Sequence, residues 1–387
     1  MRRWKPIGAA VAVLAVAGAL VVGVLHGPGT PVAGPAPTVS VSAPPQAGTV
    51  AGASLVFATF NVCKVSCDAP APSWDVRRAR VARVITTSGA DVIGLQEVTF
   101  NPTSTAKTQF LDVQNLIAPA GYVAPTMPAA ADQCRWTAAN PHPCDNTTGI
   151  VFNSRTVSQV TTPNGTASAG TLPSSGVVGG LDSESSVRKI SWAYLQGASG
   201  TGPFLVVSVH TDNSQDPAAE ASRIVLGQAL GPWADAWNAA HGFPGVPTLM
   251  LGDLNSYKKR QPNGMQQVMV DNGWLDTASA PQKRNVQYST INHNPKLPAD
   301  QQGFPKAPYI FRTSKNNPVL DATRIDYVMA RGAGLSAADY EVVIHLLPDG
   351  SFDPEALKNT NTNPHHASSR RRAERDSPWP GRRPRSR

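Results

Sequence analysis

Five short polar signatures follow apolar runs of this chain, and their residue types are those of a catalytic or metal-binding site. Each run has the length and apolar content of a buried strand, and the polar residue stands at or near its end. The residues are Asn61 in Phe-Asn-Val, Glu97 in Leu-Gln-Glu-Val, His210 in Val-His-Thr-Asp, Asp253 and Asn255 in Gly-Asp-Leu-Asn, and Asp326 in Arg-Ile-Asp-Tyr. Taken singly, each has an ordinary structural explanation, such as a turn residue or a cap. Because all five share one context, we interpret them as parts of a single site.

These residue types suit the hydrolysis of a phosphodiester. Negative charge develops around phosphorus in that reaction, and a hard cation such as Mg²⁺ neutralises it. Mg²⁺ binds few protein oxygens and keeps several waters, so Glu97 and the amide of Asn61 are sufficient ligands. Asp253 can deprotonate the attacking water, with the amide of Asn255 holding its geometry, and His210 can donate to a non-bridging oxygen. We therefore predict a hydrolase that depends on Mg²⁺, or on Mn²⁺ or Ca²⁺ in its place.

Apolar runs of strand length alternate with helical stretches along the chain. The predicted strands are 55–62, 91–95, 149–152, 187–195, 204–210, 248–251, 324–330 and 340–346. The predicted helices are 74–87, with Val76, Val81, Val84 and Ile85 on its apolar side, 105–116, and 217–237 with Asp216 as N-cap. Strands that alternate with helices but include hairpins predict an α/β (α+β) fold, in which two mixed sheets pack face to face with helices outside.

The five signatures, in this order, resemble the endonuclease/exonuclease/phosphatase superfamily, which includes deoxyribonuclease I. The resemblance spans residues 55–369, and Gln-Glu and Gly-Asp-Leu-Asn are its most specific parts. It implies a four-layered α/β sandwich, deoxyribonuclease I-like, with the site at one rim. It also implies metal binding by Asn61 and Glu97, and chemistry by His210, Asp253 and Asn255. The acid that matches Asp326 would orient a second histidine, which the family carries in a Ser-Asp-His motif on its last strand.

That last motif is missing from the sequence. Ser369 stands where the motif is due, but Arg370 and Arg371 follow it, and no apolar run comes after them. We hypothesise that the reading frame departs from the ancestral one near Ser369. The alternative is a genuine basic arm over residues 370–387 that contacts an anionic polymer. Since a group that polarises the phosphate typically contributes a hundredfold or more, we expect this chain to be a weak catalyst or less stable than its relatives.

The N-terminus has the pattern of an export signal. Three cations precede residues 7–25, which carry no charge and are rich in Ala, Val and Leu. This pattern fits either a cleaved signal peptide or a single membrane anchor within residues 1–26. Residues 27–53 are rich in Pro, Gly and Ala and predict a linker, so the folded domain is expected at 54–369. Both interpretations place that domain outside the cytoplasm, secreted or anchored to the outer face of the membrane.

The cysteines agree with export. Cys63 and Cys67 form one local pair, and Cys134 and Cys144 form another. An even number in local pairs predicts two disulfides in an oxidising compartment. A zinc site made of the four thiols is the alternative, but their spacings do not match the close pairs that zinc prefers.

The net charge of +8 does not by itself indicate a nucleic-acid groove. Its positive excess lies in the three N-terminal cations and in residues 370–387, so the rest of the chain is close to neutral. Lys258, Lys259 and Arg260 form the best local basic candidate. We consider a nuclease first, a sphingomyelinase-like phospholipid phosphodiesterase second, and a catalytically silent surface module third. A nucleic acid is the expected substrate, and we expect a monomer.

Overall fold

The computed structural model describes residues 54–66, 73–132, 134–135, 147–178, 188–198, 201–258, 260–288, 290, 312–314, 317–318 and 324–343. The chain divides into a unit of residues 1–50 and a unit of residues 51–387, and every described residue belongs to the second unit. The predicted signal or anchor, the linker and the basic tail therefore lie outside the described residues. In the described part, no helix has the length and apolar content needed to span a membrane.

One sheet has four strands, in the order β1-β2-β4-β3. Its strands are β1 (Phe57–Asn61), β2 (Val92–Gln96), β3 (Tyr122–Val123) and β4 (Thr148–Asn153). β1 and β2 run parallel, and β4 runs antiparallel to both of its neighbours. The β1–β2 connection contains the helix that a parallel pair requires.

The second sheet has seven strands, in the order β10-β14-β9-β8-β7-β5, with β6 also paired to β7. Its strands are β5 (Val157–Gln159), β6 (Ala169–Pro173), β7 (Lys189–Gly197), β8 (Phe204–His210), β9 (Thr248–Asp253), β10 (Leu275–Asp276) and β14 (Asp326–Arg331). β8 and β9 are parallel, with the long helix α4 between them, and the other pairs are antiparallel. The prediction of two mixed sheets is confirmed.

The helices are α1 (Trp74–Thr87), α2 (Gln109–Ile117), α3 (Ser175–Val178), α4 (Pro217–Ala240) and α5 (Met265–Asp271). The smaller elements are η1 (Ala118–Ala120), η2 (Thr277–Ser279), the pair β11 (Gln282–Arg284) and β15 (Asp339–Glu341), and the pair β12 (Arg312–Ser314) and β13 (Asn317–Pro318).

Two details of the predicted helices are wrong. The second helix begins at Gln109 and not at 105, because Thr108 caps it by accepting a hydrogen bond from the amide of Leu111. Val76 does not belong to the apolar side of α1, since it is 55% exposed while Trp74, Val81 and Ile85 are buried. The prediction that Asp216 is the N-cap of α4 is confirmed, although its side chain makes no capping bond and its carboxylate accepts from Ser214.

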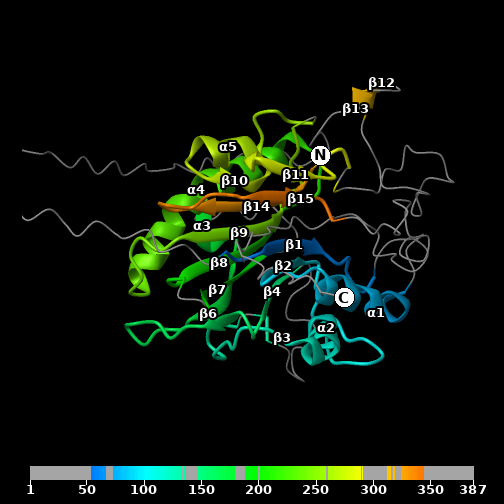
Figure 1. Ribbon diagram of the computed structural model, residues 1–387, viewed down its shortest axis with the longest axis vertical. Helices are drawn as coiled ribbons and strands as arrows, with labels where there is room; N and C mark the ends of the chain where they lie inside the picture. Colours follow the sequence, from blue (N-terminus) through cyan, green and yellow to red (C-terminus); the bar gives the residue numbers. More distant parts are fainter. Residues whose placement is uncertain are drawn as a thin grey trace, which may run out of the picture. The chain divides into compact units, whose positions relative to one another are not determined.

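Three apolar cores separate four layers. One core joins α1 and α2 to the outer face of the four-stranded sheet, and another joins α4 and α5 to the outer face of the seven-stranded sheet. The third lies between the sheets, where Phe57 and Val92 pack near Leu249 and Leu251. Figure 1 shows α4 and α5 on one side of the two sheets and α1 and α2 on the other. The predicted four-layered sandwich is confirmed.

Strand periodicity makes the layer between the sheets change character along its length. Alternate residues of β8 face this layer, so Phe204 and Val206 are followed by Ser208 and then His210. The same change occurs along β1, from Phe57 to Asn61, and along β9 from Leu249 to Asp253. One end of the layer is therefore hydrocarbon, and the other end gathers the polar side chains predicted to do chemistry.

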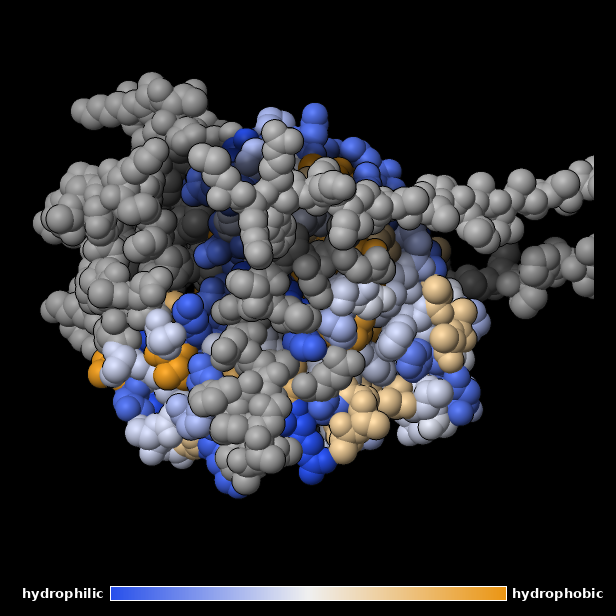
Figure 2. Space-filling model, turned by 180° about the vertical axis from the view of Figure 1, so that it is seen from behind, coloured by the Kyte–Doolittle hydropathy of each residue, from blue (hydrophilic) through white to orange (hydrophobic). Residues whose placement is uncertain are grey.

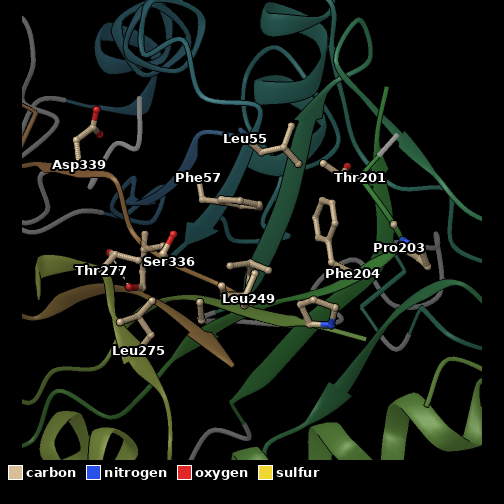
Figure 3. Close-up of a pocket in the computed structure, with 15 residues that line it drawn as sticks. Leu55, Phe57, Thr201, Pro203, Phe204, Leu249, Leu275, Thr277, Ser336 and Asp339 are labelled. Carbon is tan, nitrogen blue, oxygen red and sulfur yellow. Dashed lines mark hydrogen bonds between the residues drawn. The ribbon is translucent and has the colours of Figure 1, made fainter. Parts of the chain in front are cut away.

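The apolar end contains a cavity of about 190 Å³. Leu55, Phe57, Phe204, Leu249 and Leu275 contribute to its walls from both sheets (Figure 3). The hydroxyl of Thr277, at the same wall, already donates to the carbonyl of Val328. This cavity lies at the opposite ends of β1, β8 and β9 from His210 and Asp253.

Candidate active site

Strand register brings the predicted residues to one rim of the sandwich. In the parallel pair β8–β9, His210 stands opposite Asp253, and in the antiparallel pair β9–β14, Asp253 stands opposite Asp326. Asn61 ends β1 beside Gln96, the residue before Glu97. Side chains that are 192 positions apart in sequence, those of Asn61 and Asp253, are hydrogen bonded as a result.

The amide of Asn61 links the two carboxylates of the site. Its Nδ2 donates to Glu97 Oε1 and to Asp253 Oδ2, both at 3.1 Å. Its Oδ1 accepts from the backbone N–H of Cys63 at 2.9 Å. This bonding settles the orientation of the amide, because the carboxylates only accept and the backbone N–H only donates. Asn61 thus acts here as a donor, and binding a metal through Oδ1 would require its amide to turn over.

Glu97 is the accessible carboxylate of the group. It follows β2 with a left-handed φ of 56°, which turns the chain out of the strand. Its side chain is 22% exposed, whereas that of Asp253 is 1% exposed. Its Oε2 accepts from the backbone N–H of Lys64 at 3.1 Å. An ion entering from solvent therefore meets Glu97 before Asp253.

Arg188 sets the hydrogen-bonding role of His210. A guanidinium nitrogen of Arg188 lies 3.0 Å from Nδ1 of the imidazole. Because a guanidinium carries only donors, Nδ1 must accept, and the proton of the neutral ring is then on Nε2. Nε2 lies 3.4 Å from Asp253 Oδ2 and 3.9 Å from Glu97 Oε1. His210 therefore presents an N–H donor to the carboxylate side of the site.

Asn255 stabilises Asp253 mainly through its backbone. The backbone N–H of Asn255 donates to Asp253 Oδ1 at 2.9 Å, in a turn where Asn255 has a φ of 44°. Its side-chain Nδ2 donates to the carbonyl of Thr211 at 3.0 Å and lies 3.3 Å from His210 Nε2. The predicted support of Asp253 by Asn255 thus comes from the main chain, and the side-chain amide is a second donor beside His210.

Asp326 is buried next to these residues. The hydroxyl of Thr290 accepts the backbone N–H groups of Ile325 and Asp326, at 2.9 and 3.2 Å. Burial raises the pKa of Asp326 well above the ordinary carboxyl value, although a hydrogen bond from Thr290 and the charge of Arg324 oppose the shift. The neighbouring Arg324 is itself paired with Asp276 and lies over the ring of Tyr327.

Comparison with models of protein families shows which family this chain belongs to. The model of the endonuclease/exonuclease/phosphatase family matches residues 58–370. The chain belongs to this family. A search of curated proteins finds no match.

Solved structures of the endonuclease/exonuclease/phosphatase family share the fold. The structure of a family protein from Bacteroides vulgatus has a TM-score of 0.53 and 16% identity, and the match covers 82% of this chain and 97% of that chain. A family protein from Bacteroides thetaiotaomicron has a TM-score of 0.53 and 15% identity, and the match covers 82% of this chain and 96% of that chain. The Bacteroides thetaiotaomicron mannosyl-6-phosphatase has a TM-score of 0.52 and 16% identity, and the match covers 82% of this chain and 98% of that chain. At these identities the likeness establishes the fold, and it leaves the substrate open.

The donors at the rim fit a hard divalent cation of the kind that endonuclease/exonuclease/phosphatase enzymes use. Within the described ranges, no group of three or more His, Cys, Asp or Glu side chains is arranged to hold a metal. Mg²⁺ does not require one, because it binds one or two carboxylates and keeps its waters. Glu97, partly exposed and 3.1 Å from an amide donor, provides such a carboxylate. The prediction that Glu97 and Asn61 bind the metal stays a prediction.

Sequence reasoning missed residues that organise the site, among them Gln96 and Arg188. Gln96 is fully buried and crosses between the sheets, donating to Ser208 Oγ at 3.1 Å and to the Leu251 carbonyl at 3.3 Å. Arg188 was read only as part of a strand. The Gln-Glu signature singled out position 96 without giving it a role. For Arg188, nothing in its local sequence indicates a contact with a residue 22 positions away.

The predicted basic cluster is partly structural. Lys258 is exposed and Lys259 lies outside the described residues. Arg260 donates to the backbone carbonyl of Asn255, lies 3.5 Å from Glu220 and stacks on Tyr257. It therefore holds the loop after Asp253, and among the described residues of this cluster Lys258 is exposed to solvent.

The cysteine and C-terminal predictions reach beyond the described residues. Cys63 and Cys134 are buried, and neither is free. Their expected partners, Cys67 and Cys144, fall outside the described ranges, so the two disulfide pairings stay predictions. The same holds for Ser369, where the Ser-Asp-His motif of the family was expected.

Proposed function

We propose that this chain is an exported, divalent-metal-dependent phosphodiesterase that hydrolyses nucleic acids by attack of an activated water. The observation that supports this most strongly is the joining of Asn61, Glu97, His210 and Asp253 in one network at a rim of the sandwich. Membership of a family of phosphoric ester hydrolases gives the reaction class.

Asp253 is the general base in this proposal. Its Oδ1 accepts from the backbone of Asn255, and its Oδ2 accepts from Asn61, so the carboxylate is held on both sides. The ionised form of a carboxylate held in this way is the form that removes a proton from water. Burial at 1% exposure keeps the carboxylate from being solvated by bulk water. Asp253 therefore orients a water and takes its proton.

His210 and Asn255 bind the oxygens that gain charge. The Nε2–H of His210 and the amide of Asn255 are neighbouring donors, 3.3 Å apart. Two adjacent donors are complementary to one non-bridging phosphate oxygen, which can accept from both. A divalent cation held by Glu97 would neutralise the remaining charge of the phosphate. Asn61 keeps Glu97 and Asp253 at a fixed separation while this occurs.

Surface composition favours a nucleic acid over a lipid as the substrate. In the described part of the chain, the large exposed hydrophobic side chains are Val76, Leu111, Val123 and Val270, and none is aromatic. Figure 2 shows apolar residues in small separate groups on one described face, among mostly polar ones. A phospholipid phosphodiesterase needs apolar or aromatic contacts with the membrane surface, so it remains the second candidate.

The localisation and the C-terminal tail enter the proposal from the sequence. The charge-free stretch 7–25 after three cations supports export, as a secreted or membrane-anchored enzyme. The absence of a Ser-Asp-His motif in the sequence supports weak activity relative to the family.

An assay on DNA, RNA and sphingomyelin tests the proposal. We expect slow cleavage of a nucleic acid with Mg²⁺ and its complete loss with a chelator, restored by adding excess Mg²⁺. Activity that survives the chelator would refute the metal dependence. Cleavage of sphingomyelin alone would replace the nuclease with the lipid enzyme. If no substrate is cleaved under any condition, the silent surface module becomes the better description.

A further inference from the structure

Arg77 of α1 holds the loop that follows Asn61 through hydrogen bonds. The side chain is completely buried, and its guanidinium donates to three successive backbone carbonyls. These are Val62 at 2.8 Å, Cys63 at 3.2 Å and Lys64 at 2.9 Å. A planar guanidinium can serve several acceptors in one fixed geometry, which an ammonium cannot.

Gln109, the first residue of α2, connects this loop to the one that follows Glu97. Its Nε2 donates to the carbonyl of Cys63 at 3.1 Å. Its Oε1 accepts both the backbone N–H of Thr99, at 3.0 Å, and the Thr99 hydroxyl, at 2.9 Å. Both loops are therefore bonded to the same buried amide.

Two of the three carbonyls that Arg77 binds belong to residues whose backbone N–H groups orient the site side chains. Cys63 donates its backbone N–H to Asn61 Oδ1, and Lys64 donates its own to Glu97 Oε2. Cys63 and Glu97 both have a φ of 56°, a left-handed conformation that costs free energy for a residue with a side chain. Such a backbone persists only where its surroundings hold it, and Arg77 and Gln109 provide those bonds.

We propose that Arg77, assisted by Gln109, is a positioning residue for the metal-binding half of the site, acting through Asn61 and Glu97. The inference rests on the proposed function, because Asn61 and Glu97, which these loops orient, bind a metal only if that proposal holds. Arg77 itself faces backbone carbonyls, and it reaches the site through the 62–64 loop.

The charge of Arg77 adds to this effect. Burial lowers the pKa of its guanidinium to about 10, and the charge of Glu97 opposes the decrease. The group is therefore a cation at neutral pH, and its charge strengthens the hydrogen bonds that it donates to the three carbonyls.

The test compares Arg77→Lys with Arg83→Lys, an exposed arginine on the same helix. Three quantities are measured on the full chain: the thermal midpoint, the affinity for Mn²⁺ by calorimetry without substrate, and kcat and KM on the cleaved nucleic acid. We expect Arg77→Lys to remain folded, to bind Mn²⁺ about tenfold more weakly, and to lose about tenfold in kcat with little change in KM. Arg83→Lys should match the wild type in all three.

The outcomes separate this inference from the proposed function. If the wild-type chain binds no Mn²⁺ and cleaves nothing, the proposed function fails and this inference fails with it. If the wild type is active and Arg77→Lys keeps its metal affinity and kcat, only the positioning role is refuted. If Arg77→Lys does not fold, Gln109→Met carries the same expectation for metal affinity. A folded Gln109→Met with unchanged affinity, or a failure of both variants to fold, reduces the two residues to structural supports.

Discussion

The two ends of the layer between the sheets are built by the same strands and have opposite properties. At one end Phe57 of β1 and Phe204 of β8 meet edge to face, with ring centroids 5.6 Å apart. At the other end the same strands finish in Asn61 and His210, which are joined through Asp253. Asn61 follows Phe57 by only four positions in the sequence.

This difference shows how the fold supports a buried polar site. Burying a phenylalanine side chain contributes about 1.5–3 kcal/mol, and the apolar end contains several large side chains from both sheets. Burying a polar group costs free energy unless it is hydrogen bonded. The apolar end can therefore stabilise the sandwich, while the polar end carries bonded but less favourable groups that are suited to chemistry.

A change at the polar end should affect catalysis and leave folding nearly intact. Asp253→Asn keeps the shape of the side chain but removes the base. We expect kcat to fall by about a thousandfold, equivalent to about 4 kcal/mol in the activation barrier. The free energy of unfolding should change by only about 1 kcal/mol, because the amide keeps the shape of the carboxylate and one of the two acceptors that it offers to Asn61 and Asn255. Steady-state kinetics and chemical denaturation measure the two effects.

Asp235→Asn serves as the control for this variant, since Asp235 is an exposed acid on α4 paired with Arg331. It should alter neither quantity appreciably. A folded Asp253→Asn with wild-type kcat would show that another group is the base.

The ion pair of Asp276 and Arg324 lies at the β10 edge of the seven-stranded sheet, and its loss should affect folding more than catalysis. Arg324 is 2% exposed and donates to both oxygens of Asp276. Because Asp276→Asn would leave this buried cation without its partner charge, we expect a loss of about 3 kcal/mol at pH 7. Thermal or chemical denaturation gives this value, and the exposed Asp271→Asn is the control.

The stabilisation by this pair should also depend on pH. Burial raises the pKa of Asp276, but the charge and hydrogen bonds of Arg324 lower it by more, so the net shift is downward. The pair thus stabilises the fold fully above the ordinary carboxyl pKa of about 4, and this contribution is lost as the pH falls through the lower folded-state value. The difference between wild type and Asp276→Asn should shrink below pH 4. A constant difference down to acid pH would contradict this assignment.

The polar end could be predicted in part because strand periodicity is local. The apolar runs before His210 and Asp253 place each residue at a strand end, and both predicted strands were found with at most two residues of difference. The fold class followed from the alternation of such runs with helices. The prediction that Val76 belongs to the apolar side of α1 was wrong, because a single valine carries too little information to decide which side of a helix is buried.

The supporting residues could not be predicted because their roles depend on contacts between distant segments. Gln96 bonds Ser208 across 112 positions, and this contact exists only once the two sheets pack in their observed register. Arg77 occupies a helical position where an arginine would ordinarily be exposed, yet it is fully buried against the 62–64 loop. Residue type and spacing identify the groups that do chemistry, but they do not identify the groups that hold them.

The smallest effect is expected at Gly94, where the apolar and polar ends meet. It lies on β2 between Val92 and Gln96, and a Cβ there would be 2.5 Å from the Cβ of Leu251 and 3.2 Å from the hydroxyl of Ser208. Gly94→Ala must therefore push the two sheets apart locally. We expect it to lower the free energy of unfolding by about 2 kcal/mol.

Unlike Asp253→Asn and Asp276→Asn, Gly94→Ala should lower stability and kcat together. Gln96, two residues further along β2, bonds Ser208 and the Leu251 carbonyl on the opposite sheet, so a local separation of the sheets would also disturb the residue that precedes Glu97. Gly202→Ala is the matched control, since a Cβ at Gly202 meets nothing within 4 Å although the residue lines the apolar cavity. Denaturation and kinetics on both variants decide the point. If Gly94→Ala loses stability but keeps the wild-type kcat, a change in the distance between the sheets at Gly94 does not alter the active site. Gln96 would then not couple the packing of the sheets to catalysis.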